Sequence, residues 1–222
     1  MKKFGDNIAV DILEQDETYS LRKMQTLRFN FWIIFSTWIP FVFIAVFSNS
    51  LTLIAQMLMG GAHSLSVYLS WMSTRKSFKE QRELPDSERF NAQFMAFVFI
   101  ASFVVVVAMA VDRFIDPRDL NREMVFFGLI VNSFAVVVNF YLWRKNLRLS
   151  KLAFSLVMEC QQSLFFIKFF TVLTVEISLV LYFLLEGKGV HDYVDTFFSV
   201  ALAFLTLYSA FGLFRKTKRV IA

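Results

Sequence analysis

The chain has 222 residues, a formal net charge of +5 and a composition that is 57% hydrophobic, with 29 phenylalanines. A water-soluble domain of this size has no interior large enough to hide that much apolar surface. The composition therefore predicts a polytopic membrane protein whose partner is the lipid bilayer. Lys and Arg lie in short clusters at the ends of apolar spans, a placement that argues against nucleic acid as a partner.

Residues 1–28 are polar and mix acidic with basic side chains, so they predict a cytosolic N-terminal arm without a cleavable signal. Six apolar spans follow, each near the roughly 20 residues that a helix needs to cross the hydrocarbon core. Because the apolar runs are continuous rather than alternating, they favour helices over barrel strands. The predicted fold is an all-α membrane protein with a six-helix transmembrane domain over residues 29–214 and a basic cytosolic tail over residues 215–222. The predicted spans are Phe29–Phe47, Leu51–Ser73, Asn91–Val111, Met124–Trp143, Ala153–Leu185 and Val194–Phe214.

The distribution of Lys and Arg predicts the orientation of the spans. Five lie before the first span, five between the second and third, four between the fourth and fifth and four after the sixth, which makes eighteen on one side. The other side has four, and Lys168 lies inside the fifth span. By the positive-inside rule this asymmetry places both termini in the cytoplasm. We expect an integral, multi-pass protein of the cell (inner) membrane.

The fifth span, Ala153–Leu185, is 33 residues long, or roughly 50 Å as a helix, which exceeds the hydrocarbon thickness. We expect the excess at its start to project into the cytoplasm. The span also carries more polar side chains than any other. Lys168 is interpreted as snorkelling from this overlong helix toward the cytoplasmic interface. The alternative is an internal ion pair with Glu159 or Glu176.

The second span is long enough to cross a bilayer, yet Gln56, the pair Gly60-Gly61 and His63 lie near its middle. Polar groups at that depth are costly, so they are expected to face the bundle interior or an aqueous cavity. His63 is the only histidine within an apolar span. It is either a metal ligand or a neutral histidine that is hydrogen-bonded to a neighbouring helix. The glycine pair favours a close helix contact or a kink.

Three segments resemble the transmembrane domain of the cation diffusion facilitator (cation efflux) family. In the second span, SLTLIA followed by AHSLSVYLS is similar to the family's SLALLADALHSLSDVLS. The third span, from Glu88-Arg89-Phe90 to Val111-Asp112-Arg113-Phe114, and the sixth, from Asp195 to Phe211, also resemble family segments in register. The resemblance extends over about residues 22–217. It implies a six-helix bundle that exports a divalent metal cation in exchange for protons.

Family members that resemble this chain hold the ion with two side chains from each of the second and fifth spans, in HxxxD or DxxxD motifs. The i, i+4 spacing puts both ligands of a span on one helix face, so that two facing helices complete a tetrahedron. The matching residues here are His63 and Val67 in the second span, and Gln162 and Phe166 in the fifth. The motif is degraded, because valine and phenylalanine cannot coordinate a metal.

A second set of metal ligands is His63, Glu159 and Gln162, completed by Gln56 or water. Glu159 lies one turn before Gln162, so both residues share one face of the fifth span. Such an oxygen-rich site suits Mn²⁺ or Mg²⁺ better than Zn²⁺. The metal ion is a substrate in this interpretation, and no resident cofactor is predicted.

Two functional hypotheses follow. The first is a divergent transporter that exports a divalent metal cation, with protons as the counter-substrate. The second is a transport-incompetent relative that acts as a membrane partner or regulatory subunit, since apolar side chains hold ligand positions. Either protein is expected to form a homodimer, or a heterodimer with another membrane protein. An enzyme is not expected, because the sequence has no nucleophile–base pair, Gly-rich phosphate loop or HExxH motif.

Overall fold

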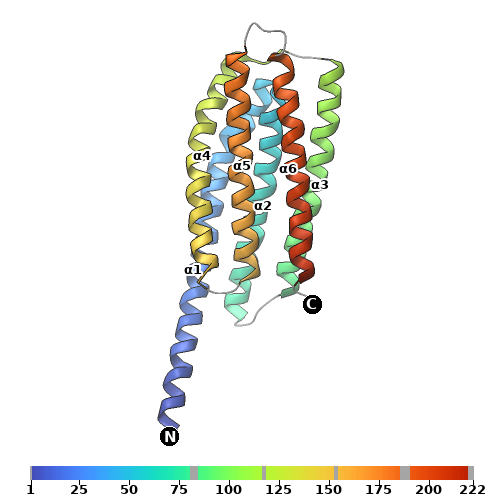
Figure 1. Cartoon of the computed structure of the whole chain (residues 1–222). Coiled ribbons are helices and arrows are strands. Elements are labelled where there is room, and N and C mark those ends of the chain that lie inside the picture. Colours follow the sequence, from blue (N-terminus) through green and yellow to red (C-terminus); the bar gives the residue numbers. More distant parts are fainter. Residues whose placement is uncertain (1, 81–84, 117–118, 153–154, 186–190, 220–222) are drawn as a thin grey trace.

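The computed structural model describes residues 2–80, 85–116, 119–152, 155–185 and 191–219. Nearly all of these residues are α-helical, and none of them forms a strand. The helices stand side by side in one bundle (Figure 1). The all-α fold predicted from the sequence is thereby confirmed. In chain order the helices are α1 (Lys2–Ser48), α2 (Leu51–Glu80), α3 (Pro85–Ile115), α4 (Arg122–Ser150), α5 (Leu156–Leu184) and α6 (His191–Arg219).

Both ends of the chain lie at the same end of the bundle, and the first part of α1 projects beyond the bundle there (Figure 1). We call this the termini end, and the opposite one the far end. The shared side of the two termini agrees with the six predicted crossings. That this side is the cytoplasm stays a prediction from the charges. The predicted arm and the first predicted span belong to one continuous helix, α1.

Five stretches of the described residues are both long and apolar enough to cross a membrane, and α2 contributes none of them. The 30 residues of α2 correspond to roughly 45 Å, so length is not the reason. α2 packs against α1, α3, α5 and α6. Because these neighbours shield it from lipid, α2 can carry polar side chains that an outer helix would expose. The five apolar stretches are Thr18–Ser48, Arg89–Ile115, Arg122–Ser150, Val157–Leu184 and Tyr193–Arg215.

The helix α5 is shorter than the 33-residue span predicted from the sequence. It has 29 residues, or roughly 44 Å, which still exceeds the hydrocarbon thickness of about 30 Å. Ser155, with φ −150° and ψ 118°, has an extended backbone, so α5 begins directly after it at Leu156. Residues 153–154, where the predicted excess begins, lie outside the described residues.

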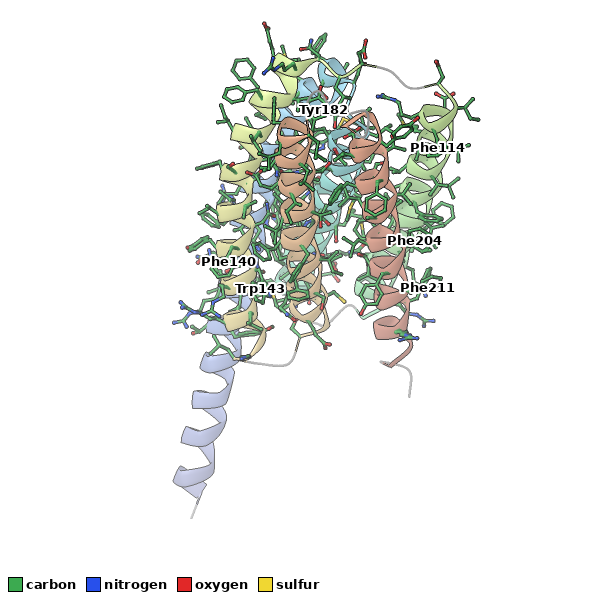
Figure 2. All side chains as sticks on the ribbon, turned by 45° about the horizontal axis from the view of Figure 1, so that its top comes forward. Phe114, Phe140, Trp143, Tyr182, Phe204 and Phe211 are labelled. Atoms are coloured by element: carbon green, nitrogen blue, oxygen red, sulfur yellow. The ribbon has the colours of Figure 1, made fainter. Side chains whose placement is uncertain are left out.

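Large aromatic side chains cover the outer surface of the bundle. Phe114 of α3 is 67% exposed, and Phe204 and Phe211 of α6 are 59% and 55% exposed. Figure 2 shows these rings along the α3–α6 side and Phe140 on α4 at the opposite side. In a bilayer such faces meet hydrocarbon, which is as apolar as the side chains themselves. The predicted contact with lipid explains their exposure.

At the far end, Asp195 of α6 caps the start of α2. Its carboxylate is buried and accepts hydrogen bonds from the backbone N–H groups of Leu51 (2.6 Å) and Thr52 (3.2 Å). It also accepts from the hydroxyl groups of Ser50 (2.6 Å) and Thr52. The first N–H groups of a helix have no partner within the helix and favour negative charge. One side chain of α6 therefore fixes the position of α2.

Near the middle of the bundle, α1 and α2 approach each other closely at Gly60. The indole Nε1 of Trp38 donates a hydrogen bond of 2.9 Å to the backbone carbonyl of Met57. A Cβ atom on Gly60 would lie 2.8 Å from Cδ1 of that indole, and one on Gly61 would lie 3.2 Å from Cζ2. The close helix contact predicted for the glycine pair is confirmed.

We expect Gly60→Ala to destabilise the protein by about 1 to 3 kcal/mol, because the indole is held by its hydrogen bond and cannot swing away without losing it. Thermal unfolding of the purified protein in detergent measures this effect. Gly212→Ala is the matched control, since a Cβ there meets nothing within 4 Å. The control is expected to leave stability unchanged or to raise it by up to about 1 kcal/mol. Equal effects of the two changes would contradict the close contact.

Candidate functional site

α2 and α5 run antiparallel and meet along a narrow polar and aromatic seam. Toward the termini end, the side-chain amide Nε2 of Gln161 donates to the hydroxyls of Ser66 (3.3 Å) and Ser70 (3.0 Å). One turn further along α5, the ring of Phe165 meets the ring of His63 edge-to-face, with centroids 4.6 Å apart. As the residue numbers rise along α5, the residue numbers of their contacts in α2 fall. These contacts define the register between the two helices. We call this contact the α2–α5 seam.

His63 lies at the centre of the seam and is only 2% exposed. Its Nε2 has no hydrogen-bond partner, so the predicted hydrogen bond to a neighbouring helix is not present at this atom. Val67, one turn away on the same face, is fully buried and packs in one cluster with Ile34, Leu142 and Phe165. A histidine is therefore present in the first ligand position, and the ligand position one turn away holds a buried valine that cannot coordinate a metal.

The residues of α5 that face α2 come one position earlier than the resemblance implied. Gln161 and Phe165 make the contacts with α2. Phe166 is 40% exposed instead, and its ring packs against Trp143 of α4 with centroids 5.2 Å apart. Gln162 is half-buried. Successive helical residues differ by about 100° in direction, so Gln162 and Phe166 are turned away from the seam.

Glu159 is half-buried in the first turn of α5, on the face that it shares with Gln162. That face is not the one that meets His63. Among the described residues, no three His, Cys, Asp or Glu side chains come together as a metal site. The set of His63, Glu159 and Gln162 thus stays a prediction, and it requires α5 to turn from its present register.

Lys168 does not snorkel to the interface. Its side chain is only 8% exposed, and its Nζ lies 3.5 Å from the backbone carbonyl oxygen of Gln56 in α2. A Cβ atom on Gly60 would lie 3.3 Å from this Nζ, so the ammonium points into the space that the glycine leaves. Neither predicted ion pair, with Glu159 or with Glu176, is found in the described part of the chain. Lys168 is a buried cation held by one carbonyl.

Beyond Lys168, toward the far end, a chain of hydrogen bonds joins α2, α4 and α5. The Nε2 of Gln56 donates to Oδ1 of Asn132 (2.8 Å). The Nδ2 of Asn132 donates to the carbonyl of Val172 (2.9 Å) and to Oε2 of Glu176 (2.8 Å). Ser133 donates to the other oxygen of Glu176 (2.5 Å). The acceptor Oε1 of Gln56 has no partner.

The asparagines of α4 are functional candidates that the sequence analysis missed. Asn132, Asn139 and Asn146 are all buried, and they recur every seven residues, which places them on one helix face. Asn146 accepts a hydrogen bond of 3.0 Å from Nδ2 of Asn30 and so joins α4 to α1. The spacing is visible in the sequence and marks the inward face of α4.

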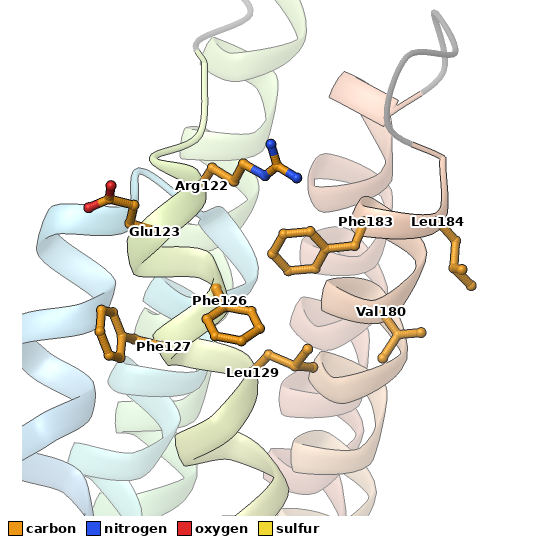
Figure 3. A pocket seen from close by; sticks show the side chains of 8 residues that line it. All are labelled: Arg122, Glu123, Phe126, Phe127, Leu129, Val180, Phe183 and Leu184. Carbon is orange, nitrogen blue, oxygen red and sulfur yellow. The ribbon is translucent and has the colours of Figure 1, made fainter.

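Two hollows lie near these residues, and they differ in character. A cavity of about 20 Å³ between α1, α2, α4 and α5 is lined by Gln56, Asn139 and Lys168, among others, and has room for about one water molecule. A groove of about 740 Å³ lies between the far-end turns of α4 and α5 (Figure 3). Six of its eight lining residues are apolar, with Arg122 and Glu123 as the others. Of these two hollows, the small cavity is the one that borders the seam.

A comparison with known families decides what kind of protein carries this seam. The profile of the cation efflux transmembrane domain matches residues 27–222. The chain belongs to the cation efflux family. A search of curated proteins finds no match.

Membership in the cation efflux family confirms the resemblance stated from the motifs, and it covers all six helices apart from the first part of α1. Family members are transporters rather than enzymes, so the chain is of the cation-transporter kind. Together with the five apolar stretches, the family also makes it an integral, multi-pass membrane protein.

Proposed function

We propose that this cation efflux protein exports a divalent metal cation in exchange for protons, with His63 as its central ligand. The observation that carries the proposal is the buried Nε2 of His63, which faces the α2–α5 seam without a partner. Imidazole nitrogen is a ligand for many divalent transition metals. A buried polar atom that lacks a partner in a transporter is a candidate for binding the substrate.

The remaining ligands in this proposal are oxygen atoms. Glu159 and Gln162 supply them if α5 turns by one residue during transport, and water completes the shell. Small helix rotations of this kind are a recurrent form of conformational change. The resulting site favours Mn²⁺ or Mg²⁺ over Zn²⁺, because it holds one imidazole and no thiolate. The cell membrane and a dimeric assembly belong to the same proposal.

Uptake into proteoliposomes tests the proposal. The purified protein is expected to move at least one of Mn²⁺, Mg²⁺, Zn²⁺, Fe²⁺, Co²⁺ and Cd²⁺ when a pH gradient is imposed. His63→Ala is expected to lower that flux at least tenfold, since it removes the only nitrogen ligand of the site. His191→Ala, which changes the chain's other histidine at the start of α6, serves as the control. The proposal fails if none of these ions moves, or if His63→Ala transports normally.

A second function is favoured by the packing beside His63. Val67 stands where the family motif has a ligand and is fully buried in an apolar cluster, and Phe165, which faces α2 from α5, belongs to the same cluster. This observation supports a transport-incompetent member that acts as a membrane partner or regulatory subunit. Such a protein is expected to co-purify with a second membrane protein. Isolation as a self-contained, metal-binding homodimer would count against it.

A further inference from the structure

Lys168 places a positive charge inside the α2–α5 seam, where a transporter of cations would hold its substrate. The side chain is buried, and its single hydrogen bond is to the backbone carbonyl of Gln56. An ammonium group in a membrane interior is costly without a carboxylate partner. A residue of this kind is retained for function more readily than for stability.

The bundle makes room for this ammonium at one place. Gly60 has no side chain, and a Cβ atom there would meet both the indole of Trp38 (2.8 Å) and the Nζ of Lys168 (3.3 Å). The indole is fixed by its hydrogen bond to α2. The space beside Gly60 is therefore bordered by α1, α2 and α5, and the lysine ammonium lies in it.

Buried polar atoms without partners lie along the seam on both sides of Lys168. From the termini end they are Oε1 of Gln161, Nε2 of His63 and Oε1 of Gln56. All three side chains are 2% exposed or less. Unpaired buried polar atoms are uncommon, and three nitrogen and oxygen atoms on one seam form a row of candidate ligand atoms for a cation. The register of the seam places Lys168 between His63 and Gln56.

We propose that Lys168 is a tethered cation, which occupies the cation path between His63 and Gln56 and excludes a divalent ion while it stays there. The path itself rests on the proposed function. A divalent ion at His63 would lie about one helical turn, or roughly 5 Å, from the ammonium. At an effective dielectric constant of about 20, that repulsion weakens binding by about five powers of ten. Entry of a metal ion thus requires the lysine side chain to withdraw.

Binding of Mn²⁺ and Zn²⁺ to the purified full chain in lipid nanodiscs, measured by equilibrium dialysis, tests this role. Lys168→Met shortens the unbranched side chain by only one atom and removes its charge, and we expect it to bind the ions at least a hundredfold more tightly. Lys168→Arg keeps the charge and is expected to bind as weakly as the unchanged protein. Adding His63→Ala to Lys168→Met is expected to abolish the gain in affinity, since the row of ligand atoms then lacks the imidazole nitrogen.

Lys145→Met is the matched control, because it removes one positive charge near the termini end, where Nζ of Lys145 lies 3.9 Å from the ring centre of Phe29. A similar gain in this control would overturn the proposal, as would no gain in Lys168→Met. If Lys168→Met does not fold, Lys168→Gln replaces it, and the same outcomes apply. Transport by the unchanged protein is a separate measurement. A gain in binding without such transport would overturn the proposed export function and leave the tethered cation standing.

Discussion

Changing Val67 to Asp, Gln161 to His and Phe165 to Asp is expected to create a zinc site together with His63. The two resulting pairs have i, i+4 spacing on facing helices, which is the arrangement that a tetrahedral ion requires. Without metal, two carboxylates in the seam destabilise the protein by several kcal/mol. With metal, the cost is offset, so saturating Zn²⁺ is expected to raise the unfolding temperature by about 10 °C or more, which corresponds to roughly 2.5 to 5 kcal/mol.

The matched control shifts two of the three changes by one residue. Val67→Asp, Gln162→His and Phe166→Asp introduce the same side chains, but on the face of α5 that turns toward α4 and lipid. We expect this set to bind Zn²⁺ at least a hundredfold more weakly in a dialysis measurement. Tighter binding by the shifted set would show that the register implied by the family motif is right and that of the structure is wrong.

Asp195→Ala is expected to destabilise the protein by about 3 to 5 kcal/mol. The change leaves two backbone N–H groups and two hydroxyls at the start of α2 without their acceptor, in a buried place that water does not reach. Chemical unfolding in mixed detergent micelles measures the loss. Asp195→Asn keeps one acceptor oxygen and is expected to recover part of it.

Asp119→Ala is the control for this change, since Asp119 is an exposed carboxylate at the same end of the bundle. It is expected to alter stability by less than about 0.5 kcal/mol. If Asp195→Ala costs no more than the control, the carboxylate does not hold α2. If both changes cost several kcal/mol, a general loss of negative charge at the far end explains the effect.

The sequence by itself determined the class of this protein and the positions of its helices. A bilayer offers no hydrogen-bond partners to the backbone, so each long apolar run has to satisfy its own amides within a helix. Every helix except α5 contains the whole of its predicted span. Even α2, too polar for a lipid-facing helix, was predicted, because it resembles family segments and is long enough. Its buried position explains the polarity.

The tertiary structure decided which face of α5 meets α2. α5 is apolar around most of its circumference, so hydrophobicity does not mark an inward face. Gln161 and Gln162 are adjacent in the sequence, and the resemblance assigned the ligand position to Gln162. The bonds of Gln161 to Ser66 and Ser70 resolve this ambiguity, because they require that residue to point at α2. A rotation of one residue changes which side chains share the site with His63.

The position of the Lys168 side chain is a second feature that the sequence alone did not determine. From sequence alone, a long flexible side chain in an overlong span was expected to reach the interface. Whether the ammonium reaches the interface depends on the space and the hydrogen-bond acceptors that the neighbouring helices provide near Lys168. Here Gly60 leaves a space and Gln56 presents a carbonyl, both from a helix more than a hundred residues earlier in the chain. Packing between distant helices therefore decided that the cation stays inside.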